Sequence, residues 1–148
     1  MTCPEGVIMS ENSVIRKDRV NIDDDVIGIY HELTSKAEEG GELAPFRTHK
    51  DVFMLAVVLG YRRDMRRPAP SGAKHTIRRE VFSEEDYQLL EAIAVATTGD
   101  VNVLLNQGEI LTIAEEYAQA GIHDVKAELL DQGGQPLRNL VAMLVGKS

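Results

Sequence analysis

The side chains most able to do chemistry in this sequence are seven basic residues gathered into 18 consecutive positions. The only acid among them is Asp64, so the segment carries a local charge of +6. The whole chain has a net charge of −8, which leaves −14 for the remaining residues. Single-sign clusters of this kind commonly meet phosphate or an acidic partner surface. The seven candidate binding residues are Arg62, Arg63, Arg66, Arg67, Lys74, Arg78 and Arg79.

Arginine outnumbers lysine six to one in this segment, and its planar fork suits bidentate contact with phosphate or carboxylate. Two interpretations stay open. The segment binds DNA or a partner protein, or its charges pair with acids elsewhere in the chain and favour the C-terminal end of a helix. A DNA complex of this kind would contact the phosphate backbone, with strong salt dependence and little reading of bases. Because only Tyr61 and Phe82 lie nearby, stacking of single-stranded bases is not expected.

No catalytic pattern accompanies the basic segment. The four histidines are far apart in the sequence, and none has the spacing of a metal-ligand motif. The glycines at 40, 41, 72, 99, 121, 133 and 134 stand where helices are expected to stop, not in a phosphate-binding loop. Cys3 is the only cysteine and has no second thiol with which to build a zinc site. The sequence therefore predicts no catalytic residue, no metal site and no cofactor, which is to say a protein that is not an enzyme.

Composition sets the broad class. With 148 residues, 43% apolar and 27% charged, the chain has the size and balance of one globular domain. Its longest apolar run, Val52 to Leu59, is far shorter than the roughly 20 residues that a membrane helix needs. The N-terminus lacks the basic start and apolar stretch of a secretory signal. These features favour a cytoplasmic protein without a membrane association.

Helical periodicity and capping residues predict the helices that position the arginines. Thr48 followed by Asp51 has the pattern of a capping box, and the apolar run after it indicates a buried central helix over about 48–63. Acids at 23–25 favour the start of an earlier helix that ends at 40–41, and Ser83 with three following acids starts a later one. Further helices are expected up to Gly121, again from residue 122, and from Pro136. The predicted fold is mainly α, a compact bundle of about six helices around the central one.

The N-terminal region has no helical periodicity. Residues 13–20 could form a short edge strand that pairs with residues 76–82, or they could remain an arm. We therefore expect a partly ordered N-terminal arm over residues 1–20 and a single helical domain over residues 21–148. A loop with two prolines and a glycine, residues 67–72, joins the central helix to the second strand candidate.

Residues 45–62, PFRTHKDVFMLAVVLGYR, resemble a motif of the DNA phosphorothioation-associated protein 4 family. Further similarity is found at residues 66–68 (RRP), 77–82 (IRREVF), 98–100 (TGD), 115–118 (EEYA) with Gly121, and 136–140 (PLRNL), so it covers roughly residues 45–145. Proteins of that family are encoded near bacterial systems that replace a backbone oxygen of DNA with sulfur and restrict unmodified DNA. The resemblance implies a context of DNA modification and anti-phage defence and brings no catalytic residues with it.

Within this context the sequence favours an accessory protein adaptor that uses the arginine-rich segment to contact a modification or restriction subunit of the same system. The alternative is a DNA-binding module or transcriptional regulator that contacts the phosphate backbone of duplex DNA. The charge of −14 outside the segment favours the adaptor, because an acidic body repels duplex DNA except at one restricted face. The sequence leaves the oligomeric state open.

Overall fold

The computed structural model describes residues 17–35, 46–70, 72, 74–131, 133 and 136–146 of the chain. Within these residues there are five α-helices and one antiparallel sheet of two strands, so the mainly α prediction is confirmed. Two short 3₁₀ helices, η2 (Arg79–Val81) and η3 (Val101–Leu105), complete the fold. The main elements are β1 (Arg19–Ile22), α2 (Ile27–Ser35), α3 (His49–Arg62), β2 (His75–Arg78), α4 (Glu84–Thr98), α5 (Gln107–Leu129) and α6 (Pro136–Leu144).

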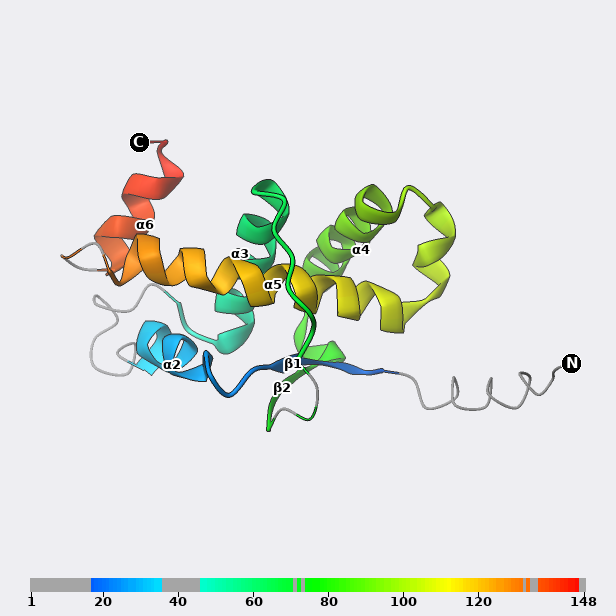
Figure 1. Cartoon of the computed structure of the whole chain (residues 1–148), viewed down its shortest axis with the longest axis horizontal. Helices are drawn as coiled ribbons and strands as arrows, with labels where there is room; N and C mark the ends of the chain where they lie inside the picture. Colours follow the sequence, from blue (N-terminus) through cyan, green and yellow to red (C-terminus); the bar gives the residue numbers. More distant parts are fainter. Residues whose placement is uncertain are drawn as a thin grey trace, which may run out of the picture.

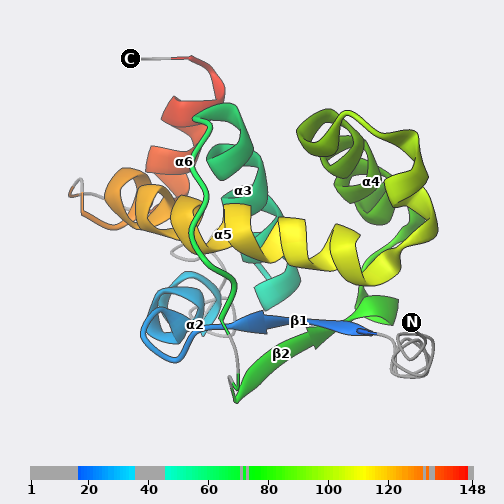
Figure 2. The ribbon, with the colours of Figure 1, turned by 45° about the vertical axis from the view of Figure 1, so that its right-hand side comes forward.

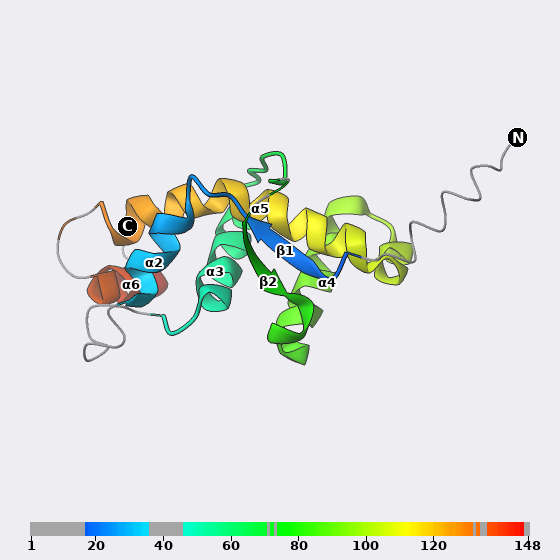
Figure 3. The same ribbon diagram turned by 90° about the horizontal axis from the view of Figure 1, so that it is seen from below.

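Helix α5 is the spine of the molecule (Figure 1). It contacts α3, α4, α6, β1 and η3, and half of its 23 residues are buried. Helix α3 packs across it and agrees with the predicted central helix to within one residue at each end. The centre of the fold is therefore shared by α3 and α5. Seen from below, the two strands and α2 lie along one side of this pair (Figure 3).

The helix starts lie where the capping residues predict them. The Thr48 hydroxyl accepts a hydrogen bond from the backbone N–H of Asp51, and α3 begins at His49, the residue after Thr48. Ser83 and Asp86 form a complete capping box before α4, with distances of 3.0 Å in both directions. Each pair satisfies amide groups that the first turn of a helix leaves without a partner.

Gly121 does not end a helix, as the sequence led us to expect. It lies inside α5, which runs without a break to Leu129, so the two helices predicted on either side of it are one. A Cβ at Gly121 would lie 1.9 Å from the carbonyl oxygen of Ala56, and one at Gly60 would lie 2.2 Å from that of Tyr117. Both glycines are therefore needed because the α3 and α5 backbones touch.

The strand pair forms, but both strands differ from the predicted positions: β2 ends at Arg78, because residues 79–81 of the predicted second strand form η2. Strand β1 lies over residues 19–22 and pairs with β2, Val20 facing Ile77 across the ladder. Residues 13–16 of the predicted strand lie outside the described residues. Asn21 and Ile22, expected at the start of a helix, belong to the strand because Val20 and Ile22 are both buried against the core.

A buried carboxylate fastens β1 to the spine. Glu115 of α5 is only 1% exposed, and one of its oxygens accepts hydrogen bonds from the backbone N–H and the side-chain amide of Asn21. Its other oxygen pairs with the ammonium of Lys17 at 2.6 Å. Burial raises the pKa of Glu115, while these donors act in the opposite direction. The N-terminal strand is thus held by ionic as well as apolar contacts.

Helices α2 and α6 are the first and the last described helices of the chain. Helix α2 begins at Ile27, and the predicted end of that helix at residues 40–41 lies outside the described residues. In α6, Leu140 and Met143 pack against the core, whereas Leu137, Val141 and Leu144 are exposed. Among the residues described, none of the helices combines the length and apolar character that a bilayer crossing requires.

Candidate functional site

The arginine-rich segment, residues 62–79, leaves the end of α3 and passes across α5 to β2 (Figure 2). Two backbone hydrogen bonds turn the chain at the end of α3, from Asp64 N–H to the Tyr61 oxygen and from Met65 N–H to the Gly60 oxygen. A third backbone hydrogen bond, from Arg67 N–H to the carbonyl oxygen of Glu116 at 3.1 Å, attaches the segment to the middle of α5. The fold therefore presents the first arginines against one face of the spine.

Arg63 and Arg66 both pair with acids of α5. The Arg63 guanidinium lies 2.6 Å from the carboxylate of Asp124 and 3.5 Å from that of Glu128. Arg66 donates from Nε and Nη2 to one oxygen of Glu116. Hydrogen bonding to these acids raises the pKa of both arginines. The two charges are thus neutralised within the chain.

Arg67 contacts an imidazole, whereas Arg63 and Arg66 contact carboxylates. Its Nη1 lies 3.2 Å from Nε2 of His123 on α5. Partial burial, and then the charge of Arg67, lower the pKa of His123. The neutral ring can accept a hydrogen bond from the guanidinium, so Arg67 keeps its positive charge without a counter-ion at this contact.

The later basic residues lie at a second place, around β2. Arg78 pairs with Glu80 at 3.0 Å on the surface. The guanidinium of Arg79 stacks 3.6 Å from the centre of the Tyr87 ring, and its buried Nε has no hydrogen-bond partner. In the part of the chain that the structure describes, neither Lys74 nor Arg62 forms an ion pair. The seven predicted residues therefore form two groups, of which Arg63, Arg66 and Arg78 already have acidic partners.

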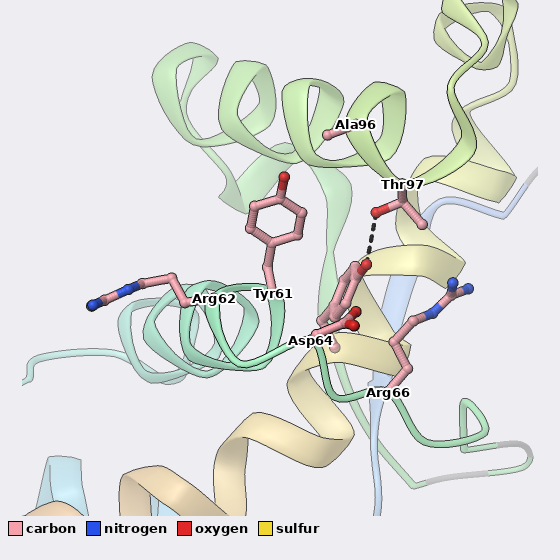
Figure 4. Close-up of a pocket in the computed structure, with 7 residues that line it drawn as sticks. Tyr61, Arg62, Asp64, Arg66, Ala96 and Thr97 are labelled. Carbon is pink, nitrogen blue, oxygen red and sulfur yellow. Dashed lines mark hydrogen bonds between the residues drawn. The ribbon is translucent and has the colours of Figure 1, made fainter.

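A cavity of about 530 Å³ opens beside the first group, at the end of α3 (Figure 4). Its floor contains Tyr117 of α5, whose hydroxyl lies 2.8 Å from the Thr97 hydroxyl of α4. The Tyr61 ring meets the Tyr117 ring edge to face, with centroids 5.6 Å apart. Arg66 lies over the Tyr117 ring at 5.4 Å, whereas Arg62 extends away from the other lining residues. The lining residues are Tyr61, Arg62, Asp64, Arg66, Ala96, Thr97 and Tyr117.

From the sequence, Asp64 is only the lone acid of the segment, and Tyr117 has no predicted role. The structure gives both a place in the cavity. No spacing in the sequence signals that Thr97 of α4 meets Tyr117 twenty residues later, because the contact depends on how α4 packs on α5.

Three histidines that are distant in the sequence also meet. The ring of His31 on α2 lies 5.1 Å from that of His49 on α3 and 6.4 Å from that of His75 on β2. His75 also lies 3.6 Å from Asp24. Partial burial lowers the pKa of His49, and the charges of His31 and His75 lower it further. Among the described residues, no group of three or more histidine, cysteine or acidic side chains has a metal-binding arrangement.

Comparison with known proteins gives one result. A family profile described as DNA sulphur modification system-associated protein 4 matches residues 19–148. This range contains β1, every described helix and the whole arginine-rich segment. No curated protein and no solved structure matches the chain.

Proposed function

From the premise that the chain belongs to the DNA sulphur modification system-associated protein 4 family, we propose that it is a non-catalytic accessory protein of such a system. It acts as a protein adaptor, and the arginine-rich segment contacts a modification or restriction subunit of the same system. The role belongs to anti-phage defence and is carried out in the cytoplasm, where these subunits meet DNA.

One observation carries the choice of an adaptor, namely the neutralisation of Arg63 and Arg66 by the acids of α5. Non-specific binding to duplex DNA gains its free energy when free cations replace the counter-ions of the phosphates. Cations that are already paired, on a chain with a net charge of −8, contribute little to that exchange. The same pairs hold the start of the segment, residues 63–66, against α5, and a surface that is ordered before binding favours recognition of a protein.

The remaining cations of the segment define the adaptor contact. Arg62 and Arg67 are exposed at the end of α3, and Lys74 is exposed before β2. An acidic patch on a partner subunit complements them, and such rim charges set association rate and specificity more than affinity. The exposed apolar side chains of α6, Leu137, Val141 and Leu144, offer the desolvated contact that affinity requires.

A DNA-binding module is the second candidate, and it is favoured by Arg62 and Lys74, which form no ion pair with any described residue. In that case the protein would hold duplex DNA through phosphate contacts, with an affinity that falls steeply as the salt concentration rises.

Co-purification with the system's subunits tests the proposal. The tagged chain is co-expressed with them in three forms, namely wild type, Arg62→Glu/Arg67→Glu, and Arg47→Glu, which reverses an exposed arginine just before α3, at the opposite end of that helix, as a matched control. We expect the wild type and the control to retain a subunit and the double variant to lose it while keeping its circular dichroism spectrum. Equal retention by all three would remove the segment from the contact.

The same proteins are then titrated with labelled duplex DNA, with and without phosphorothioate linkages, over a range of salt. Salt-dependent binding that the double variant loses, without capture of any subunit, would replace the adaptor by the DNA-binding module. A preference for sulfur would tie the protein to the modification itself.

A further inference from the structure

The cavity at the end of α3 shares Arg62 with the proposed adaptor contact and gathers other groups to which neither the adaptor nor the DNA-binding function assigns a role. It offers an aromatic ring face from Tyr61, which is 39% exposed, and a pair of hydroxyls from Thr97 and Tyr117. A carboxylate, that of Asp64, and a guanidinium, that of Arg66, are also among the lining groups (Figure 4). Hydrogen-bond acceptors, donors and a stacking surface are thus collected within about 530 Å³. This volume is in the range of small-molecule sites.

Asp64 occupies its position at a conformational cost. Its φ is +55°, and it is the only described residue other than glycine with a positive φ. The bonds from Asp64 N–H and Met65 N–H to the last turn of α3 form a helix-ending motif that normally has glycine at this position. A side chain is disfavoured there relative to glycine, although Asp tolerates it better than most residues.

Within the described part of the chain, no contact of the Asp64 carboxylate accounts for this cost. Among the described residues it takes part in no ion pair and accepts no hydrogen bond. It does contribute to the raised pKa of Arg66, so the two opposite charges lie close enough to interact. Backbone strain that local contacts do not use is typical of ligand sites.

We propose that this cavity binds a nucleotide whose base presents N–H donors to Asp64 and whose phosphate meets Arg66. The proposal goes beyond the adaptor role and does not depend on it. Tyr61 supplies the face on which the base stacks, a contact that tolerates every base. Asp64 supplies the selectivity, because a carboxylate has two acceptor oxygens and guanine is the base that offers two adjacent N–H groups to them.

Arg66 is prepared for the phosphate by its other contacts. Glu116 binds its Nε and Nη2 and leaves further N–H groups of the fork free. The Tyr117 ring beneath it limits its rotamers. The hydroxyls of Thr97 and Tyr117 bond to each other and keep lone pairs available for a ribose hydroxyl.

Calorimetric titration of the whole chain with guanosine, adenosine, cytidine and uridine monophosphates, and with inorganic phosphate, tests the proposal. Asp64→Asn and Asp64→Gly remove the carboxylate at a position that favours both new residues, so they should fold at least as well as the wild type. Asp25→Asn removes an exposed acid far from the cavity and serves as the matched control.

We expect guanosine monophosphate to bind more tightly than the other nucleotides. Both Asp64 variants should weaken it about tenfold or more and leave adenosine monophosphate nearly unchanged. The control should bind both as the wild type does. Absence of nucleotide binding at millimolar concentration, equal affinity for inorganic phosphate alone, or full guanosine binding by Asp64→Gly would each overturn the proposal.

A short single-stranded oligonucleotide with a terminal guanosine then identifies the source of the ligand. Tighter binding to it than to the free nucleotide assigns the cavity to a strand end. Equal or weaker binding assigns the cavity to a free nucleotide. The readouts do not involve a partner subunit, so failure here leaves the co-purification result of the adaptor test intact.

Discussion

Replacing Gly121 by alanine should disrupt the central helix pair. The new Cβ would lie 1.9 Å from the Ala56 oxygen and 2.8 Å from the Gly60 nitrogen. Because a relaxed contact between a carbon and a carbonyl oxygen is about 3.3 Å, the two backbones would have to separate by about 1.4 Å. No rotamer change can relieve a clash with backbone in the middle of a helix.

The size of the effect follows from two opposing contributions. Alanine is favoured over glycine inside a helix by about 1 kcal/mol. Overpacking that side chains can absorb costs about 1–3 kcal/mol; here the whole α3–α5 interface must move, so we expect a cost above that range, about 4 kcal/mol. We expect a net loss of about 3 kcal/mol, a large share of the roughly 5–15 kcal/mol that stabilises a domain of this kind.

Urea unfolding followed by circular dichroism measures the change. Gly28→Ala in α2 is the matched control, because nothing lies within 4 Å of its new Cβ, and it should be neutral or stabilise by up to about 1 kcal/mol. Gly60→Ala should resemble Gly121→Ala, and the double variant should lose less than the two single losses together, because both act on one interface. A Gly121→Ala protein with the unfolding midpoint of the wild type would refute the backbone contact.

Three further variants test the contacts around the spine. Glu115→Ala should cost about 2 kcal/mol, because Lys17 and Asn21 lose a buried acceptor, and hydrogen exchange should show faster opening of β1. Unchanged protection of β1 would contradict this role. Tyr117→Phe removes the bond to Thr97 and should lower the free energy of unfolding by about 1 kcal/mol, whereas an unchanged midpoint would show that bond to be replaceable by water. Burial and neighbouring imidazoles hold the folded pKa of His49 below 6.5, so the unfolded chain binds more protons and stability should fall on acidification below about pH 6.5. His49→Gln should flatten that dependence below about pH 6.5, and an equally steep profile there would assign it to other groups.

Capping patterns predicted the starts of α3 and α4 correctly because the causes of these helix starts are local. Thr48 with Asp51, and Ser83 with Asp86, satisfy amides within one turn, so a pattern of four residues contains the whole interaction. Gly121 shows where such reasoning fails. A glycine is typical of a helix end, but it also permits close backbone approach, and only the path of α3 distinguishes the two uses.

Only the charge of the candidate site could be predicted from the sequence. The sequence shows the excess of arginines but not their partners, because Asp124, Glu128 and Glu116 become partners only when the segment crosses α5. The meeting of three histidines has the same origin, since each ring comes from a different element. Such contacts depend on packing angles that residue spacing does not contain.

Three consecutive residues of α5 connect these separate features. Glu115 binds the N-terminal strand, Glu116 binds Arg66, and Tyr117 forms the floor of the cavity. Successive side chains on a helix point about 100° apart, so one short stretch reaches three neighbours at once. Glu116 holds Arg66 over the Tyr117 ring, so the arginine-rich segment and the cavity are positioned by the same turn of α5. Because Arg62 belongs to both the cavity lining and the proposed adaptor contact, the two surfaces adjoin.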